Sequence, residues 1–562
     1  MKKLNPTILT NLLTLYLLFI CNYCFATKKP IKVTVTQLPE QVWMLEYQLP
    51  KAVNQVQFYR PGDLSRADWR LFDKNLSMKK LQPNKTAINS VNGALFDTFK
   101  IQFKSNFNHL EKDYELNQQF SDGGLTLYTG HLVLSLNEEK LRNHTFKLVS
   151  MLGNHSIVKG QVSSLAQYWT DDFLQGTYVY FGSSKILKTD HMLAVLDQQL
   201  PSWIRDEMMT ALPTIFQHYT EKFKQPLNET PMVLFSYKTT EESGTQYSGG
   251  ALSGVIQLKL TGKDWQIKSK QNLSKFLHFI AHEATHLWNA QMIPLSGEHD
   301  ESWIHEGSAE YLSVKILQEL GIYNEDDVHR ENEKYLNNCI DDLKNNAVTE
   351  FDKHKNFGAF YSCGAVIAYL SEKAMQVVNP NSQLFDLWAD LIQRVKENNL
   401  QLTTKQYVKS LLLFSKNNKI ITNLMAFLDE PQLHPIEFFN EFFKEVDIKL
   451  KTNSKHPNKA QQVIQTTIKH LMMIDCKSYS YENHQNYYTV GNMKNCSTLR
   501  PGMKISKIEG LTLDKAHDIY TITQEKCQNN NTIELQPIED DRLLIACNSQ
   551  MPNVNPWLSF EM

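Results

Sequence analysis

The pentapeptide His282-Glu283-Ala284-Thr285-His286 constrains this chain of 562 residues more than any other stretch. Residues four apart on a helix lie one above the other, so both imidazoles can be directed to one point. Zn²⁺ binds such nitrogens at about 2.0–2.1 Å, together with a third protein ligand and an open position for water. Glu283 is then placed as the general base. Ser274 is the expected N-cap, and the apolar residues around the pentapeptide recur at helical spacing: Leu273, Phe276, Leu277, Ile280, Ala281, Ala284, Leu287 and Trp288.

A second helix is predicted from Ser302 to Leu320, with Gly321 as its stop signal. Glu306 lies in the first turn and can supply the third metal ligand, although the charge of a carboxylate also favours a helix N-terminus by itself. Glu310 shares the face of Glu306. A carboxylate there can orient a ligand imidazole by accepting its other N–H, or it is an ordinary exposed helix residue.

These segments resemble signatures of the gluzincin metallopeptidases, specifically the M1 aminopeptidase and M61 glycyl-aminopeptidase-like groups. Trp303-Ile304-His305-Glu306-Gly307 resembles the stretch in which the Glu binds zinc. His286-Leu287-Trp288-Asn289, with Ile293-Pro294 downstream, is similar to an M61 segment. The resemblance covers roughly residues 231–370 and implies a thermolysin-like zinc catalytic domain.

Tyr361-Ser362-Cys363-Gly364-Ala365-Val366 is similar to a further M1 segment. The resemblance implies that Tyr361 stabilises the oxyanion of a tetrahedral intermediate. The residues alone leave a second reading open, in which Tyr361 packs in an aromatic core with Phe357, Phe360 and Tyr369.

Two features depart from the M1 pattern. Nineteen residues separate His286 from Glu306 where the pattern has eighteen, so strict counting selects His305 as the third ligand. We favour Glu306, because its Trp and Gly neighbours match the signature and loops accommodate insertions. The M1 motif G-x-M-E-N is replaced by Ser248-Gly249-Gly250-Ala251-Leu252-Ser253-Gly254. Its missing Glu leaves the choice between exopeptidase and endopeptidase open.

Residues 249–251 are the predicted substrate-binding segment. Val255 to Leu260 alternates as a half-exposed edge strand would, and such a strand can bind an extended peptide by main-chain hydrogen bonds. Gly249 and Gly250, just before it, would let a substrate backbone approach closely. An ordinary hairpin turn is the alternative for these residues.

The N-terminus has the features of a secretory signal peptide. Lys2 and Lys3 precede an apolar run from Leu12 to Ile20, which is too short to span a bilayer, and Cys24-Phe25-Ala26 offers a cleavage site. Ile20 argues against lipidation of Cys21. We therefore expect an exported protein, periplasmic or secreted, with no stable membrane span after signal removal. Six cysteines then remain, and of the fifteen formal pairings sequence proximity favours Cys339–Cys363, Cys476–Cys496 and Cys527–Cys547.

The predicted fold class is a multidomain α+β protein. A signal peptide (1–26) precedes an N-terminal β-rich domain (27–200), whose strands include 31–35, 125–128, 131–136 and 177–181. A thermolysin-like catalytic domain (201–325) and a helical domain carrying Tyr361 (326–450) follow. After a linker (451–462) comes a domain (463–562) in which Leu499-Arg500-Pro501-Gly502-Met503-Lys504-Ile505 resembles a PDZ stretch, with Val490 to Met493 as a weak carboxylate-binding loop.

The function expected from these features is that of a zinc metallopeptidase. The resemblance implies an aminopeptidase that acts on peptide or protein substrates. A zinc endopeptidase on the same site and a non-catalytic exported peptide-binding protein are the alternatives. The net charge of −2 gives no electrostatic case for nucleic acid as a partner. The oligomeric state does not follow from the sequence.

Overall fold

The computed structural model describes residues 29–561 apart from 61–65, 82–84, 108–113, 137–142, 172–175, 228, 241–243, 294–300, 344, 352, 354–355, 399, 485, 492 and 494. The predicted signal peptide and Pro294 lie outside the described residues. The chain divides into two compact units, residues 1–184 and 185–562. Within the described part, no helix is both long enough and apolar enough to cross a membrane.

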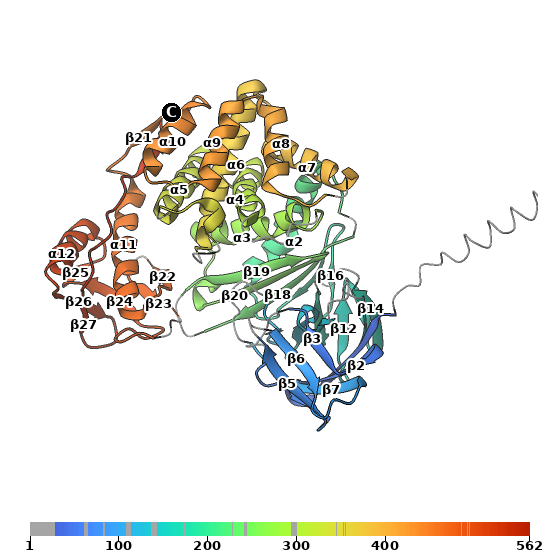
Figure 1. Ribbon diagram of the computed structural model, residues 1–562. Helices are drawn as coiled ribbons and strands as arrows, with labels where there is room; N and C mark the ends of the chain where they lie inside the picture. Colours follow the sequence, from blue (N-terminus) through green and yellow to red (C-terminus); the bar gives the residue numbers. More distant parts are fainter. Residues whose placement is uncertain are drawn as a thin grey trace, which may run out of the picture. The chain divides into compact units, whose positions relative to one another are not determined.

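The first unit consists of β-strands in three sheets (Figure 1). Alternating residues of β1 point into the core, as expected for a strand with one buried face. The rings of Trp69 and Phe103 stack there, 4.7 Å apart. The sheet orders are β14-β11-β1-β2-β7-β4, β10-β3-β6-β5 and β13-β12-β15-β9-β8. The strands are β1 (Ile31–Leu38), β2 (Val42–Val53), β3 (Gln55–Phe58), β4 (Arg70–Leu71), β5 (Leu76–Leu81), β6 (Lys85–Ser90), β7 (Phe96–Lys104), β8 (Asn117–Gln119), β9 (Leu125–Tyr128), β10 (Leu134–Ser135), β11 (His144–Val149), β12 (His155–Val158), β13 (Gln161–Ser163), β14 (Ala166–Asp171) and β15 (Tyr178–Gly182).

Three of the four strands predicted here are confirmed, as β1, β9 and β15. The fourth, residues 131–136, is wrong over most of its length. Thr129–Leu132 forms a 3₁₀ turn, and only Leu134 and Ser135 belong to a strand, β10. All four turn residues are buried, so the apolar and polar alternation of this stretch does not reflect two faces of a strand.

The second unit opens with a five-stranded sheet of order β16-β17-β18-β20-β19. Its strands are β16 (Leu187–Lys188), β17 (Leu193–Leu196), β18 (Met232–Lys238), β19 (Gln246–Leu252) and β20 (Val255–Thr261). The prediction that residues 255–260 form the edge strand is therefore wrong. β20 lies between β18 and β19 and is largely buried, whereas β19, which contains Gly249 and Gly250, is at the edge. The glycines lie within the hairpin strand rather than in its turn.

Helices pack on this sheet and on one another (Figure 1). Helix α2 (Ser202–Phe223) precedes β18 along the chain and continues through Pro213. The helix predicted to bind a metal is α3 (Lys270–Asn289), and Phe276 from it stacks on Phe235 of β18. The expected N-cap Ser274 is wrong by more than a turn, because Ser269 accepts the capping hydrogen bond from the Asn272 N–H. The remaining helices of this part are α4 (Ser302–Glu319), α5 (Glu325–Leu343), α6 (Gly358–Val378), α7 (Leu384–Asn398), α8 (Thr404–Ser415), α9 (Asn418–Asp429) and α10 (Pro435–Lys444).

The C-terminal part forms its own small core of β-strands and two helices. They are α11 (Pro457–Cys476), β22 (Tyr481–Asn483), β23 (Tyr488–Val490), β24 (Lys504–Ile508), β25 (Leu511–Thr512), α12 (Ala516–Gln528), β26 (Thr532–Pro537) and β27 (Leu543–Ala546). A PDZ identity for this part stays a prediction.

The segment expected to be a linker, residues 451–462, is structured instead. It contributes to β21 (Leu450–Thr452) and to the first turns of α11. β21 pairs with the last strand, β28 (Leu558–Phe560). Side chains of α5 hold β28 in place: Asn337 accepts from the Leu558 N–H, and Glu333 accepts from the Phe560 N–H. Polar composition alone did not distinguish a linker from these short elements.

Candidate metal centre

His282 and His286 lie one turn apart on the buried face of α3. Their Nε2 atoms are 3.1 Å apart. Glu306 is the fifth residue of α4, just beyond the first turn in which it was predicted. It places its Oε2 3.3 Å from each of these nitrogens. The structure thus brings together the three residues that the sequence singled out, and their ligand atoms all lie within 4.8 Å of one another.

The chemistry of this cluster fits a divalent cation. Glu306 Oε2 is buried and has no hydrogen-bond partner among the described residues, and neither has Oε2 of the adjacent Glu283. A buried carboxylate oxygen without a donor is costly, and a bound cation removes that cost. Two imidazoles and one carboxylate around a shared point form the donor set of catalytic zinc sites.

His305, the alternative third ligand, does not point to the same place. Its Nε2 lies 3.4 Å from the other carboxylate oxygen of Glu306, Oε1. In this position His305 can donate a hydrogen bond to Glu306 and so orient it. The extra residue in the loop before α4 therefore shifts the register without moving Glu306 away from the two histidines.

Glu310 lies behind His282, where a supporting carboxylate was predicted. Its Oε1 is 3.2 Å from His282 Nδ1, and its Oε2 is 2.9 Å from His278 Nε2. The hydroxyl of Tyr335 on α5 donates to the same Oε2 at 2.6 Å. His278, one turn before His282, thus contacts Glu310 and not the point on which the three ligand atoms converge.

Asn289 supports His286 in the corresponding way. Its Nδ2 donates to the His305 carbonyl at 2.7 Å, which fixes the amide so that Oδ1 faces His286 Nδ1 at 3.1 Å. Nδ1 of His286 must then carry the proton, and Nε2 keeps its lone pair for a metal. Asn289 and Tyr335 were missed by sequence reasoning. The spacing of Asn289, three residues after His286 on one helix, could have indicated it, whereas no local pattern marks Tyr335.

The close crossing of α4 and α6 positions Tyr361. A Cβ on Gly307 would lie 2.2 Å from Gly364 Cα, and a Cβ on Gly364 would lie 2.4 Å from the Trp303 carbonyl oxygen. Only glycine at both positions lets the helices approach this closely. The Tyr361 ring consequently stacks on His282, with 5.8 Å between the ring centroids.

Tyr361 is not a core aromatic. It is 39% exposed, whereas the adjacent Phe360 is buried. The negative charge of Glu306, followed by burial and by the charges of Glu283 and Glu310, raises the pKa of Tyr361 well above its usual value. The phenol is therefore protonated at neutral pH and can donate a hydrogen bond. The predicted disulfide Cys339–Cys363 joins α5 to α6 two residues further on.

Burial and the histidines act in opposite directions on the carboxylates. Burial raises the pKa of Glu283, as a proton acceptor at this position requires. Burial also works against ionisation of Glu306, but the imidazoles of His286 and His282 outweigh it and hold the pKa of Glu306 well below its usual range. The two carboxylates thus differ in electrostatic character although they lie at the same centre.

Gly249 of the edge strand lies against the metal-binding helix. A Cβ on Gly249 would meet the Phe279 ring at 2.9 Å and Glu283 Oε1 at 3.0 Å. β19 therefore runs directly beside the predicted general base. Gly250 follows it on the strand. Ala251 is buried, and its carbonyl already accepts a hydrogen bond from Gln291.

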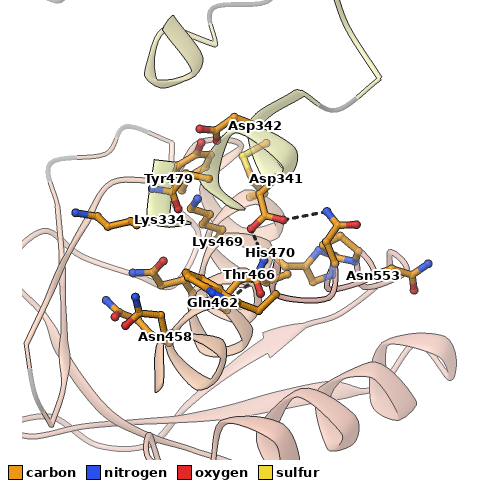
Figure 2. A pocket seen from close by; sticks show the side chains of 17 residues that line it. Lys334, Asp341, Asp342, Asn458, Gln462, Thr466, Lys469, His470, Tyr479 and Asn553 are labelled. Carbon is orange, nitrogen blue, oxygen red and sulfur yellow. Dashed lines mark hydrogen bonds between the residues drawn. The ribbon is translucent and has the colours of Figure 1, made fainter. Parts of the chain in front are cut away.

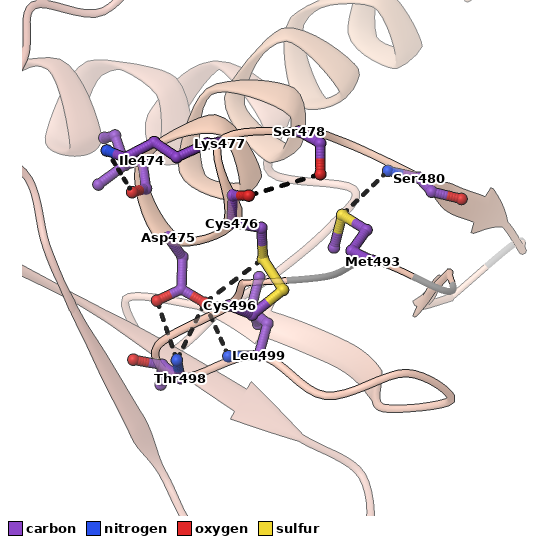
Figure 3. Close-up of a disulfide and its surroundings, with 10 residues drawn as sticks. All are labelled: Ile474, Asp475, Cys476, Lys477, Ser478, Ser480, Met493, Cys496, Thr498 and Leu499. Atoms are coloured by element: carbon purple, nitrogen blue, oxygen red, sulfur yellow. Dashed lines mark hydrogen bonds between the residues drawn. A yellow bond between two sulfur atoms is a disulfide. The ribbon is translucent and has the colours of Figure 1, made fainter. Parts of the chain in front are cut away.

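Two further groups of potential ligands surround disulfides in the C-terminal part. The sulfur atoms of Cys527 and Cys547 are bonded to each other near His470, and those of Cys476 and Cys496 near Asp475 (Figure 3). Asp475 moreover accepts hydrogen bonds from the Thr498 and Leu499 N–H groups. These groups fit structural cross-links rather than metal sites, and the pairings are the ones favoured by sequence proximity.

No protein-family model matches the chain, and no curated protein sequence is significantly similar to it. Two solved structures of LTA4 hydrolase from yeast, one native and one with bestatin, are 12% identical over 79% of this chain and 72% and 71% of theirs, with TM-scores of 0.44 and 0.43. A crystal structure of an aminopeptidase N family protein from Idiomarina loihiensis has a TM-score of 0.62 at 14% identity, over 94% of this chain and 98% of that one. Over nearly its whole length, this chain has the fold of that aminopeptidase N family protein.

Proposed function

We propose that the protein is a zinc-dependent metallopeptidase of the aminopeptidase type. The observation that carries the proposal is the convergence of His282 Nε2, His286 Nε2 and Glu306 Oε2, in which the carboxylate oxygen is buried without a hydrogen-bond donor. The likeness to the aminopeptidase N family protein supports the same reading at the level of the fold.

His282, His286 and Glu306 would hold the zinc ion. When bound, zinc acts as a Lewis acid toward the scissile carbonyl and a water molecule. Asn289 and Glu310 keep the two imidazoles oriented, because each faces the Nδ1 atom that points away from the convergence point. Their role is to preserve the geometry while the substrate binds and leaves.

Glu283 is the proposed proton carrier. Its buried Oε2 has no donor among the described residues, so it can accept a proton from the attacking water and return it to the leaving amine. Tyr361 is the proposed oxyanion donor. Its hydroxyl is protonated at neutral pH and its partly exposed ring stacks on His282, so it could donate a hydrogen bond to a developing oxyanion there.

The edge strand gives the endopeptidase alternative a specific basis. Residues 246–254 form β19 and its turn, and none of them is acidic. An aminopeptidase needs an anion to hold the free α-amino group of its substrate, and this strand does not supply one. Activity on peptides with a blocked N-terminus is the property that separates the two candidates.

The three disulfides support an oxidising compartment, periplasmic or extracellular. They join residues 20 to 24 positions apart in a chain of 562 residues. Export through a cleaved signal peptide remains part of the proposal, since residues 1–26 lie outside the described part of the chain.

The decisive experiment compares the wild type with Glu283→Gln, which keeps the shape of the side chain and removes its basicity. We expect both proteins to contain about one zinc per chain, and the variant to lose roughly 10²–10⁴ in kcat/KM. Glu397→Gln is the matched control, because it makes the same change from carboxylate to carboxamide at an exposed position on α7. Each enzyme is assayed on the same peptides with a free and with an acetylated N-terminus.

Three results would change the conclusion. Unchanged turnover by Glu283→Gln contradicts the proposed chemistry. Efficient turnover of acetylated peptides removes the aminopeptidase label and selects the endopeptidase. If the zinc-loaded wild type binds peptides and cleaves none of them, the protein is a non-catalytic peptide-binding protein.

A further inference from the structure

A cavity of about 510 Å³ lies between α5 and α11 in the second unit (Figure 2). Its charged side chains include Asp341 and Asp342 on α5 and Lys469 on α11, so it does not favour a ligand of one charge. Asp341 already accepts hydrogen bonds from Gln462 and Asn555, at 2.8 and 2.9 Å (Figure 2). None of the proposed metal-binding or catalytic residues lines this cavity. The edge strand β19 differs from it, because β19 runs beside the proposed general base and carries an exposed aromatic side chain.

Strand β19 is exposed toward its start and closed toward its end. Tyr247 is 45% exposed and Gly249 is exposed as well, whereas Ala251 and Leu252 are buried. At the buried end, the side chain of Gln291 donates a hydrogen bond of 3.0 Å to the Ala251 carbonyl. A peptide that adds to this edge as a further strand can therefore pair beside Tyr247 and Gly249 but not at Ala251.

The register of the hairpin turns the main chain of Tyr247 and Gly249 toward the open side. Leu252 and Val255 are the pair that closes the two-residue turn between β19 and β20. In an antiparallel pair, residues that bond to the partner strand alternate with residues whose N–H and C=O groups face away from it. Counted back from the closing pair, Tyr247 and Gly249 are of the second kind. Within the described residues, no other strand pairs with this edge.

Two side chains one turn apart on α3 hold the ring of Tyr247. Its centroid lies 4.5 Å from that of Phe279, and Lys275 Nζ lies 5.2 Å from it. A Cβ on Gly249 would meet the same Phe279 ring, so positions 247 and 249 share one face of the strand, as its alternation requires. The ring is thus fixed from the side of α3 while nearly half of the residue stays exposed.

Tyr247 is also within the electrostatic reach of the metal centre. Partial burial, followed by the charge of Glu310, raises the pKa of Tyr247, and the charge of Glu283 acts in the same direction. The phenol is therefore neutral at pH 7. It offers a substrate an apolar aromatic surface rather than a charge.

We propose that Tyr247 forms the wall of a subsite for an aromatic side chain of the substrate peptide. The peptide residue opposite Gly249 would lie next to Glu283, where the bond is cut. The residue two positions along the peptide would lie opposite Tyr247, and side chains of opposite residues on one face are in contact. The inference rests on the proposed peptidase function and deepens it, because it names a side-chain class that the substrate carries away from the cleaved bond.

The test uses the full-length protein and a set of peptides in which a single Phe is moved through an alanine background. Mass spectrometry locates each cleaved bond. We expect one Phe position, fixed relative to that bond, to raise kcat/KM of the wild type by roughly tenfold over the all-alanine peptide, the scale of one aromatic contact. A wild type with no such position overturns the subsite, whatever the variants do.

Variants at position 247 then assign the preference to the ring. In Tyr247→Ala the ratio between the Phe peptide and the all-alanine peptide should fall to about one. Tyr247→Phe should keep it, because the contact is made by the ring and not by the hydroxyl. Tyr59→Ala removes an equally exposed tyrosine from the first unit and is the matched control. The same ratio in the wild type and Tyr247→Ala, or its loss in Tyr247→Phe, contradicts the proposal.

A binding measurement separates this inference from the proposed function. Calorimetry on zinc-loaded Glu283→Gln with the same peptides measures their affinity without turnover. If the wild type cleaves no peptide, yet Glu283→Gln binds the Phe peptide more tightly and the double variant with Tyr247→Ala does not, the peptidase is wrong and the subsite stands. If the wild type cleaves all the peptides at equal rates and Glu283→Gln binds them equally, the peptidase stands and the subsite is wrong.

Discussion

The metal centre and the C-terminal part both gather histidine with potential metal ligands, yet the two regions treat those ligands differently. In the candidate metal centre, Glu306 Oε2 lies 3.3 Å from two imidazole nitrogens and accepts no hydrogen bond from the described residues. In the C-terminal part, His470 Nε2 lies 3.8 Å from Cys547 Sγ, and that sulfur is bonded to Cys527. Proximity of potential ligands is therefore not sufficient for a metal site. The ligand atoms must also have free lone pairs, and neighbouring polar groups must hold the ligand side chains in the right orientation.

Removal of a ligand should give the largest difference between the two regions. We expect the zinc content of His286→Ala to fall from about one ion per chain to nearly none, because only two of the three proposed protein ligands remain. His470→Ala should keep the full zinc content. Metal analysis after gel filtration measures both. Retention of zinc by His286→Ala would contradict the metal site at His282, His286 and Glu306. Loss of zinc from His470→Ala would contradict a purely structural role for the C-terminal cluster.

Tyr361→Phe tests whether the residue stacked on His282 acts in the chemistry. We expect kcat to fall by roughly 10²–10³ with little change in KM and none in zinc content, because a single oxyanion donor is lost. Tyr168→Phe, at an exposed position in β14, is the control. An unchanged kcat would leave Tyr361 with a packing role only.

Glu310→Gln probes the support behind His282, which the C-terminal cluster lacks in comparable form. The change weakens the acceptor for His282 and His278, so we expect zinc affinity to fall by roughly 10–100-fold. Competition with a coloured chelator measures this affinity. Glu319→Gln, near the C-terminal end of the same helix, should bind zinc as the wild type does.

Gly364→Ala tests the helix crossing that brings Tyr361 to the centre. The added Cβ would meet the Trp303 carbonyl oxygen at 2.4 Å, so we expect a loss of about 1–3 kcal/mol in the free energy of unfolding and a lower kcat. Gly358→Ala is the control on the same helix, because a Cβ there has no neighbour within 4 Å. Urea unfolding measures the free energy of unfolding of both variants. Equal values would mean that α4 and α6 move apart enough to accommodate the added methyl group.

The smallest effect concerns pH and the C-terminal cluster. Burial lowers the pKa of His470 below its usual value of about 6.5. The unfolded chain therefore binds a proton at His470 more readily than the folded protein does. The contribution of the neutral imidazole to the free energy of unfolding is present above about pH 6.5, and it is lost as the pH falls toward the lower pKa of the folded state. We expect His470→Asn to lose less stability than the wild type between pH 7.5 and 5.5 in urea unfolding. A steeper loss in the variant would contradict this sign.

The parts of the site that the sequence could predict are those in which the spacing is local. His282 and His286 are one helical turn apart, and the glycines beside Glu306 and Tyr361 mark the contact of α4 with α6. Tyr335 could not be found in this way, because it lies on a different helix from Glu310 and 25 positions away from it. The edge strand was misassigned since a strand buried between two neighbours can alternate in polarity as an exposed one does.

The disulfides and most strands followed from patterns within about 25 residues. The region 451–462 did not, because its order depends on residues near the opposite end of the C-terminal part. β21 exists only where β28 pairs with it, and the two strands are more than a hundred residues apart. The composition of such a segment shows that it is polar, but it does not indicate that a strand far along the chain pairs with it.

The attachment of β28 to α5 has a consequence for the order in which the protein can mature. Glu333 and Asn337 receive their backbone partners from residues 558–560, more than 220 positions later. Glu333 and Tyr335 are two residues apart on α5, and Tyr335 buttresses Glu310. Until residues 558–560 have been synthesised, a nascent chain leaves α5 without this anchor, so the support that Tyr335 gives to Glu310 would be complete only once β28 has paired.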